Sequence, residues 1–245
     1  MDLALEFLII LILLIFQSLF GIGLLLFGTP SFLLLGYSFE STLVLLLPIS
    51  ISISFFQILY QKFSIRNIAM EFSIFCLPFL VFFLIIAIKL GEIINIKIYV
   101  SLLLIASSLI ILNKNRIINN NLSLKKYRKV LLMIIGSIHG FTNMGGSFLS
   151  IFSTMFYGGD RGITRNYISY GYLVMGVIQY ITVLFVGLER IDLTKLFYVF
   201  IALVLFLPIQ KIFNKIDDSL FTIIINYTAL IFGFLTLLMS LKLIS

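Results

Sequence analysis

Residues 131–150 read LLMIIGSIHGFTNMGGSFLS, an apolar run that polar residues and glycines interrupt in its middle. Residues 21–30, GIGLLLFGTP, interrupt the first apolar run of the chain in a similar way, with three glycines and a proline. Glycine weakens a helix, and proline removes a backbone donor and clashes with the preceding turn. The two stretches therefore predict two broken helices.

The composition indicates that these helices lie in a membrane. Hydrophobic residues make up 61% of the chain and charged residues 11%, with a mean hydropathy of +1.20. Soluble domains carry roughly 25% charged residues, and one helical crossing of a bilayer needs ~20 mostly apolar residues. Because the apolar runs are continuous rather than alternating, we expect helices and not barrel strands. The fold class expected is an all-α polytopic membrane protein with about eight transmembrane helices, over residues 4–27, 41–60, 68–89, 96–112, 129–156, 166–187, 193–213 and 219–241.

A polar stretch divides these runs into two groups of four. Residues 113–128, NKNRIINNNLSLKKYR, form the longest polar segment of the chain. We expect residues 1–112 to be a first four-helix repeat, residues 113–128 a polar basic linker, and residues 129–245 a second four-helix repeat, with helices 1 and 5 broken. Whether the repeats are parallel or inverted stays open, because four full crossings per half make them parallel and a re-entrant half-helix changes that count.

The formal net charge of +7 comes from basic residues in the short connections between apolar runs. This placement sets orientation in the membrane and argues against a nucleic-acid partner. With eight crossings, eleven Lys and Arg residues fall on the side of the termini and six on the other. The positive-inside rule then predicts cytoplasmic N- and C-termini in a bacterial-type inner (plasma) membrane.

The two breaks are also the expected binding site. A half-helix N-terminus carries unpaired N–H groups and a partial positive charge, and glycine lets a ligand approach that backbone closely. An anion is therefore the natural guest, and corresponding breaks in two halves are typical of a transporter's binding site. The alternative is that the glycines only allow tight helix packing.

Polar residues at the second break add to this hypothesis. His139, the one histidine of the chain, lies inside an apolar run, where an ionisable group indicates function. As imidazolium it attracts an anion or moves a proton, and as neutral imidazole it bonds a neighbouring carbonyl. Thr142 and Asn143 offer neutral donors to an oxyanion, or cap the second half-helix.

The first run resembles the glycine-rich signature of the TauE/SafE family of sulfite and organosulfonate exporters, G-x-G-G-G followed by a proline and a glycine. Gly21, Gly23, Pro30 and Gly36 match it, while Leu24 and Leu25 stand at two glycine positions. The fifth run is similar to a second copy, G-x-x-G-x-G-G-G, in which Gly140, Gly145 and Gly146 match and Asn143 and Ser147 replace glycines.

The resemblance covers nearly the whole chain and implies further contacts in the second helix of each half. The family has a small-residue stretch there, and Ser50 and Ser169 stand nearest to the corresponding places in this sequence. The candidate substrate-binding residues are Gly21, Gly23, Ser50, His139, Thr142, Asn143, Gly145, Gly146 and Ser169.

The function expected is a secondary carrier or facilitator for a small anion, and the resemblance implies a sulfur oxyanion or an organosulfonate. A transporter of another small solute and a non-transporting membrane assembly protein are the alternatives. The sequence contains neither an H-E-x-x-H metal motif nor a G-x-S-x-G nucleophile elbow, so we expect neither an enzyme nor a catalytic residue, metal or cofactor. The expected partners are the small anionic substrate and the lipid bilayer, and homo-oligomer formation is left open.

Overall fold

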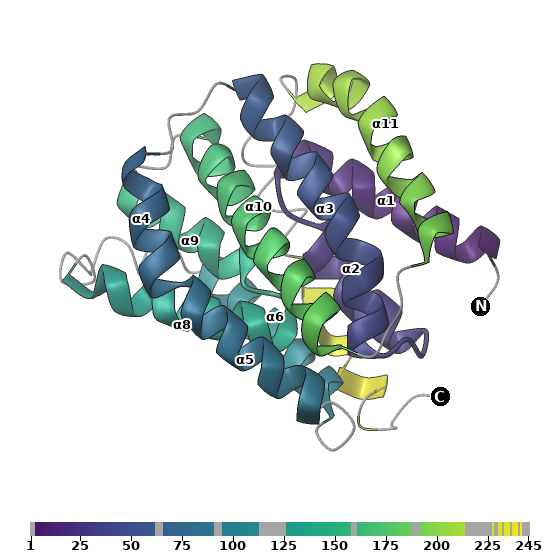
Figure 1. Ribbon diagram of the computed structural model, residues 1–245, viewed down its shortest axis with the longest axis horizontal. Helices are drawn as coiled ribbons and strands as arrows, with labels where there is room; N and C mark the ends of the chain where they lie inside the picture. The colour runs from purple at the N-terminus through teal and green to yellow at the C-terminus, as the bar shows by residue number, and fades with distance from the viewer. Residues whose placement is uncertain are drawn as a thin grey trace.

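A computed structural model describes residues 3–61, 66–90, 95–112, 126–157, 161–187 and 192–213, with scattered positions between 227 and 241. Within these ranges the regular structure is helical throughout and contains no strand (Figure 1). Four of the described helices are long and apolar enough to cross a membrane, over Phe39–Tyr60, Met70–Leu90, Arg165–Val186 and Leu193–Ile212. The all-α membrane class expected from the sequence agrees with this architecture.

Helices occupy the first seven predicted runs, and the last run, 219–241, lies largely outside the described residues. The helices of the first half are α1 (Leu3–Phe20), α2 (Leu24–Leu34), α3 (Phe39–Gln61), α4 (Arg66–Phe75), α5 (Leu77–Leu90) and α6 (Ile96–Leu112). Those of the second half are α8 (Arg128–Thr142), α9 (Gly146–Tyr157), α10 (Arg161–Val186), the 3-10 turn η2 (Leu193–Leu196) and α11 (Phe197–Phe213). The count of eight crossings is not confirmed.

The first run breaks where its glycines predict, but it then folds back on itself. Gly21 and Gly23 have φ angles of 74° and 139°, which glycine adopts at little cost. Beyond them, α2 returns alongside α1, with the rings of Phe16 and Phe27 at 5.7 Å between centroids. After α2, the Tyr37 hydroxyl donates to Glu6 near the start of α1, at 2.6 Å. The run is therefore a helical hairpin and not one interrupted crossing.

The fifth run forms a second hairpin of the same kind. Asn143 ends α8 in the left-handed region, with φ 62° and ψ 17°. The guanidinium of Arg128, at the start of α8, lies over the rings of Phe152 and Phe156 in α9, at 6.0 Å and 5.4 Å from their centroids. The chain thus leaves the hairpin on the side where it entered.

The centre of the molecule is the antiparallel pair α3 and α10 (Figure 1). Glycines of α10 and its C-terminal flank mark the register, because Cβ atoms at Gly176 and Gly187 would contact Ile51 and Glu40 of α3. Since each hairpin leads directly into one of these two antiparallel helices, the hairpins enter from opposite ends of the molecule. In Figure 1, α1 accordingly extends to the right of the pair and α8 to the left.

Each hairpin also packs along a neighbouring long helix in parallel orientation. In α8, Gly136 and Gly140 face the backbone of Cys76 and Leu80, at the junction of α4 with α5 and in α5. Small residues four apart allow such close approach between membrane helices. These two glycines therefore serve packing, as the alternative interpretation of the sequence proposed, whereas Cβ atoms at Gly145 and Gly146, at the second tip, would meet only side chains.

We expect Gly140→Ala to destabilise the protein, because its Cβ would overlap the backbone carbonyl of Leu80, which cannot move as a flexible side chain does. Overpacking of this kind costs about 3 kcal/mol. Thermal unfolding in detergent measures the loss. Gly176→Ala is the matched control, since its Cβ would contact only side-chain atoms of Ile51, at 3.0 Å and 3.7 Å. Equal melting temperatures for the two variants would contradict the close packing of Gly140 against the backbone of α5.

Candidate functional site

The two hairpin tips bring together the features that the sequence analysis selected. The first helical hydrogen bond of α2 runs from Phe27 N–H to the Gly23 carbonyl, at 2.8 Å, and that of α9 from Leu149 N–H to the Gly145 carbonyl, at 2.9 Å. The amides of residues 24–26 and 146–148 consequently have no acceptor in their own helix. Gly23 supplies no side-chain cap, and Leu24 to Leu26 are buried. Both tips thus place the positive end of a helix dipole inside the protein.

The second tip contacts α2 in the interior, about one turn beyond the first tip. The side-chain amide of Asn143, at the tip of the second hairpin, donates to the hydroxyl of Thr29 in α2, at 3.0 Å. Met144 and Ile22 belong to one buried cluster with Ile168 and Tyr172 of α10. The α10 helix therefore passes both tips and forms a shared wall.

His139 is the centre of the second tip and is fully buried. Its Nδ1 accepts the Gly145 N–H at 3.0 Å, so the ring proton of the neutral imidazole resides on Nε2. Its carbonyl accepts from the Asn143 N–H at 2.7 Å and from Gln179 Nε2 at 3.3 Å. This geometry favours the neutral form, which presents one N–H donor and no positive charge.

Tyr172 is a member of this tip that the sequence analysis missed. Its ring meets the ring of His139 edge to face, with centroids 5.9 Å apart at 79°. A Cβ at Gly146 would overlap its hydroxyl, so the hydroxyl lies against the first residue of α9. A tyrosine in an apolar run is a common packing residue, and no sequence pattern distinguishes this one.

Two polar atoms of the second tip are buried without a hydrogen-bond partner among the described residues, Asn143 Oδ1 and Tyr172 Oη. The side chains of His139 and Gln179 hydrogen-bond each other. A buried polar group costs about 1–3 kcal/mol when it is left unsatisfied, and buried polar groups in native proteins are paired with protein, water or a ligand. The cluster is therefore suited to hold a small polar guest.

The first tip is built from glutamine and serine side chains. Gln17 Nε2 donates to the hydroxyl of Ser50 at 2.8 Å, and Gln57 Nε2 donates to the Gln17 carbonyl at 2.9 Å. The Ser169 hydroxyl donates to Gln57 Oε1 at 2.8 Å and lies 2.9 Å from the Arg165 carbonyl. The structure thus brings Ser50 and Ser169 to the first tip, where both are engaged with protein partners.

Arg165 is the second functional candidate outside the predicted site residues. Its side chain is 3% exposed and packs against Gly21, whose Cβ would lie 3.3 Å from Arg165 Cγ. Its Nη2 donates to the Ser18 carbonyl at 2.8 Å and to Gln210 Oε1 at 2.6 Å. A cation there complements the carbonyl end of α1. The signal in the sequence was weak, because Arg165 stands at the edge of its apolar run.

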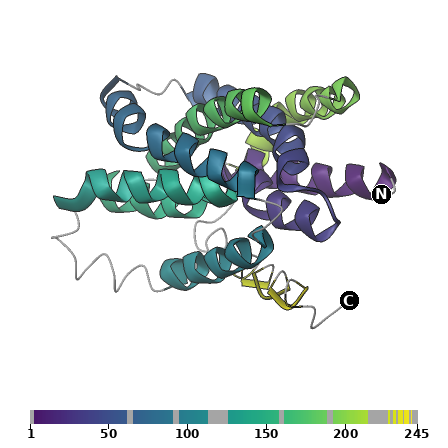
Figure 2. The same cartoon turned by 60° about the horizontal axis from the view of Figure 1, so that its bottom comes forward.

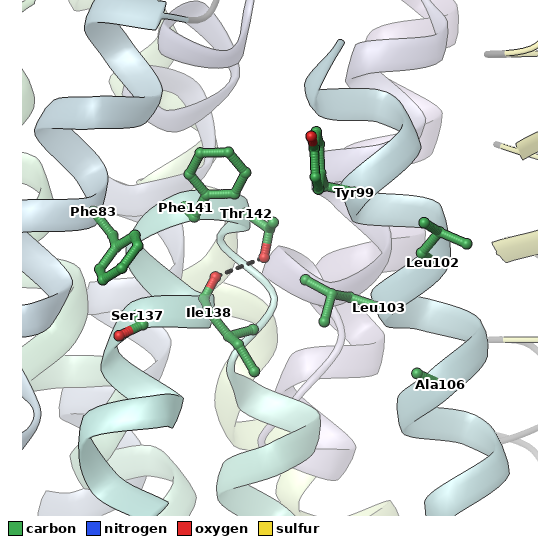
Figure 3. Close-up of a pocket in the computed structure, with 9 residues that line it drawn as sticks. All are labelled: Phe83, Tyr99, Leu102, Leu103, Ala106, Ser137, Ile138, Phe141 and Thr142. Atoms are coloured by element: carbon green, nitrogen blue, oxygen red, sulfur yellow. Dashed lines mark hydrogen bonds between the residues drawn. The ribbon is translucent and has the colours of Figure 1, made fainter. Parts of the chain in front are cut away.

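Thr142 is placed away from the other candidates. Its hydroxyl donates to the Ile138 carbonyl one turn earlier, at 2.7 Å. With Ile138 it lines an apolar pocket of about 430 Å³ between α5, α6 and α8 (Figure 3). Asn143 ends α8 rather than capping α9. The proposed capping role of these two residues is therefore wrong.

The two tips are built alike at a constant sequence distance. Gln57 Nε2 bonds the Gln17 carbonyl, and Gln179 Nε2 bonds the His139 carbonyl. The backbone bond that closes α1 joins Gly21 to Gln17, and the bond that closes α8 joins Asn143 to His139. Gln17 thus corresponds to His139, Gln57 to Gln179 and Gly21 to Asn143. Each residue of the second tip stands 122 positions after its counterpart at the first tip.

The base of each hairpin is held by an ion pair to a short helical segment beside it, η2 for the first hairpin and α4 for the second. Glu6 in α1 accepts from Lys195 and from the hydroxyl of Tyr198, the latter at 2.9 Å. Arg128 in α8 pairs with Glu71 of α4 at 2.8 Å. The hairpin supplies the acidic residue in the first pair and the basic residue in the second. In both pairs the first helix of the hairpin is joined to the start of the helix that runs parallel to it.

Comparison of the chain with protein-family models, with curated proteins and with solved structures found no match.

Proposed function

We propose that this protein is a secondary carrier or facilitator for a small anion that binds between the two hairpin tips. The observation that carries the proposal is the pair of buried helix N-termini, α2 and α9, at tips that lie along the same face of α10 beside unpaired polar side chains. Helix N-termini bind anions through free N–H groups and the helix dipole. The resemblance to the TauE/SafE family implies a sulfur oxyanion or an organosulfonate as the substrate.

The two halves are proposed to be inverted repeats. Equivalent residues lie 122 positions apart, and the equivalent helices α3 and α10 run antiparallel. Each half then consists of one re-entrant hairpin and three crossings: α3, α4–α5 and α6 in residues 1–112, and α10, α11 and the run 219–241 in residues 129–245. In this arrangement six segments cross the membrane in place of the eight expected.

Inverted repeats with discontinuous helices at the midplane support alternating access. Irregular backbone at membrane depth is tolerated where protein buries it or where it lines a cavity, and both tips are buried here. His139, Asn143, Ser169 and Gln179 are each fully buried, so neither side of the membrane reaches the tips in this conformation. A movement of one hairpin and its long helix relative to the other would open the site to one side at a time.

Radiotracer flux in proteoliposomes tests the proposed function. We expect the full chain to move small monoanions from a panel of sulfur oxyanions, sulfonates and carboxylates, with discrimination among them. A protein in which the glycines only pack helices would give flux equal to that of empty liposomes, and anions would not raise its melting temperature.

The six-crossing arrangement reverses the orientation expected from eight crossings. Eleven of the 17 Lys and Arg residues then share the side of the middle connection, and the termini lie on the other side. These eleven are Lys62, Arg66, Lys114, Arg116, Lys125, Lys126, Arg128, Lys129, Arg161, Lys211 and Lys215. The positive-inside rule places them in the cytoplasm.

Labelling of single-cysteine variants checks this topology. In a Cys76→Ala background, we expect Asn120→Cys to be protected from a membrane-impermeant maleimide in intact cells and Ser245→Cys to be labelled. With eight crossings the two positions would lie on the same side. Equal labelling of both cysteines in intact cells would therefore contradict the re-entrant hairpins, and inside-out vesicles supply the reverse control.

A further inference from the structure

The pocket between α5, α6 and α8 is a cavity that the anion site does not use (Figure 3). It has a volume of about 430 Å³ and an almost wholly apolar lining, to which Phe83 of α5, Tyr99 and Leu102 of α6 and Phe141 of α8 contribute. The rings of Tyr99 and Phe141 meet edge to face, with centroids 5.4 Å apart. Helices from both halves of the chain therefore share this one hollow.

The pocket offers its guest no free hydroxyl from α8. Ser137 donates to the Met133 carbonyl at 2.9 Å, and Thr142 donates to the Ile138 carbonyl at 2.7 Å. A cavity without free polar partners does not hold ordered water, and an empty one leaves its lining atoms without packing contacts. The pocket is therefore suited to an apolar guest.

The open side of the pocket faces the surroundings of the helices. Tyr99 and Leu102 line the pocket and are 47% and 51% exposed. The helix α5 belongs to the candidate membrane span Met70–Leu90, and α6 is a shorter apolar helix. In a bilayer these exposed side chains contact hydrocarbon, so a lipid acyl chain is the apolar guest that reaches the pocket directly.

Two lysines lie near one end of the pocket. Lys89 is in the last turn of α5, about 9 Å along the helix from Phe83, and Lys97 begins α6 two residues before Tyr99. Among the described residues neither lysine forms an ion pair. Glu92 stands between them in the sequence, outside the described part of the chain, so residues 89–97 carry one net positive charge.

This end of the pocket has the chemistry of a membrane–water interface. Tyrosine side chains are enriched there, because the ring is apolar and the hydroxyl is polar. Lysines near the membrane surface attract the phosphate groups of anionic lipids. A phospholipid with its head group at Lys89 and Lys97 would extend an acyl chain past Tyr99 and into the pocket.

We propose that the pocket between α5, α6 and α8 binds one acyl chain of an anionic phospholipid, whose head group lies at Lys89 and Lys97. The inference goes beyond the proposed anion carrier and does not depend on the substrate carried. Phe141 and Thr142 end α8 directly before Asn143, so the bound chain packs against the end of the second hairpin. A zwitterionic lipid has the same acyl chain but less attraction to the lysines, so the preference for an anionic head group distinguishes a lipid site from ordinary lipid contact.

Tryptophan fluorescence tests this preference, because the chain contains no tryptophan of its own. The full chain with Phe83→Trp is reconstituted in a zwitterionic phospholipid that contains a minor fraction of anionic phospholipid with brominated acyl chains, which quench tryptophan on contact. Brominated zwitterionic lipid at the same fraction gives the reference. We expect the pocket to take up the anionic lipid about fivefold more readily than the zwitterionic one.

Val204→Trp is the matched control, since Val204 is 57% exposed on the apolar helix α11 and does not line the pocket. Its quenching is expected to follow the bulk lipid composition for both head groups. An equal anionic preference at Val204→Trp would show general enrichment around the protein and would overturn the proposal. If Phe83→Trp does not fold, Leu102→Trp reports from the wall that α6 provides.

Two further variants separate the head-group contact from the acyl-chain contact. Replacing Lys89 and Lys97 together by glutamine is expected to remove the anionic preference at Phe83→Trp, and Ala106→Phe, which fills the pocket from α6, is expected to remove the excess quenching. Equal quenching by the two lipids at Phe83→Trp, or a preference that survives in the lysine variant, would overturn the proposal. Neither result depends on anion flux, so the proposed function is tested separately.

Discussion

Replacing His139 by asparagine is expected to lower anion flux by about tenfold to a hundredfold. The asparagine oxygen takes the place of Nδ1 and can keep the bond to Gly145 N–H, but the Nε2 donor is lost. Hydrogen bonds to charged groups contribute about 1.5–3 kcal/mol, which corresponds to this range of affinity. Flux per folded protein in proteoliposomes measures the effect, with the folded amount taken from size-exclusion chromatography.

The control for this variant is His139→Gln, in which the side-chain amide reaches the position of Nε2 and restores a donor there. We expect it to retain more flux than His139→Asn, although it loses the acceptor for Gly145 N–H. His139→Ala removes both functions and is expected to be the least active. Flux that is unchanged in all three variants would remove His139 from the site.

Gly146→Ala is expected to reduce flux by about a hundredfold. The added Cβ would overlap the hydroxyl of Tyr172, a fully buried side chain, so the ring must leave the N-terminus of α9 or the helix must shift. Overpacking costs up to about 3 kcal/mol, and displacement of the binding groups adds to that cost. Flux and melting temperature are measured together, because the substitution affects both.

The comparison that isolates the site effect is Gly140→Ala, which overpacks the same hairpin against Leu80 but leaves its tip unchanged. We expect Gly146→Ala to lose much more flux than Gly140→Ala at equal loss of thermal stability. Similar flux per folded protein in the two variants would show that the tip acts in packing alone.

The positions of both breaks follow from the sequence because they depend on local backbone chemistry. Gly21 and Gly23 adopt positive φ, and Asn143 occupies the left-handed region that asparagine tolerates. The direction of the chain after each break does not follow from hydropathy, which measures how apolar a run is and not whether it returns. The contacts of Phe27 with Phe16 and of Arg128 with Phe156 decide that point.

The sequence located residues of the second tip best where an isolated polar residue lay within an apolar run. His139 and Asn143 stand out in the sequence and lie at the second tip. Thr142, one position before Asn143, faces the apolar pocket instead, because one residue turns a helix by about 100°. Arg165 and Tyr172 lie at the two tips through α10, whose rotation about its axis comes from packing against α3 and α9.

The position of helix α6 also depends on tertiary structure. Figure 2 shows it beside the C-terminal segment, away from the α3–α10 pair. A Cβ at Gly233 would contact Leu104 and Ile105 of α6. A contact between residues so far apart in sequence leaves no periodic signal in either run.

A crystal of the full chain soaked in selenite, an oxyanion whose selenium scatters anomalously, tests the central claim most directly. We expect an anomalous peak between the hairpin tips, within hydrogen-bond distance of the first amides of α9 and of His139 Nε2. A peak elsewhere in the protein, in a preparation that transports the same anion, would contradict binding at the tips.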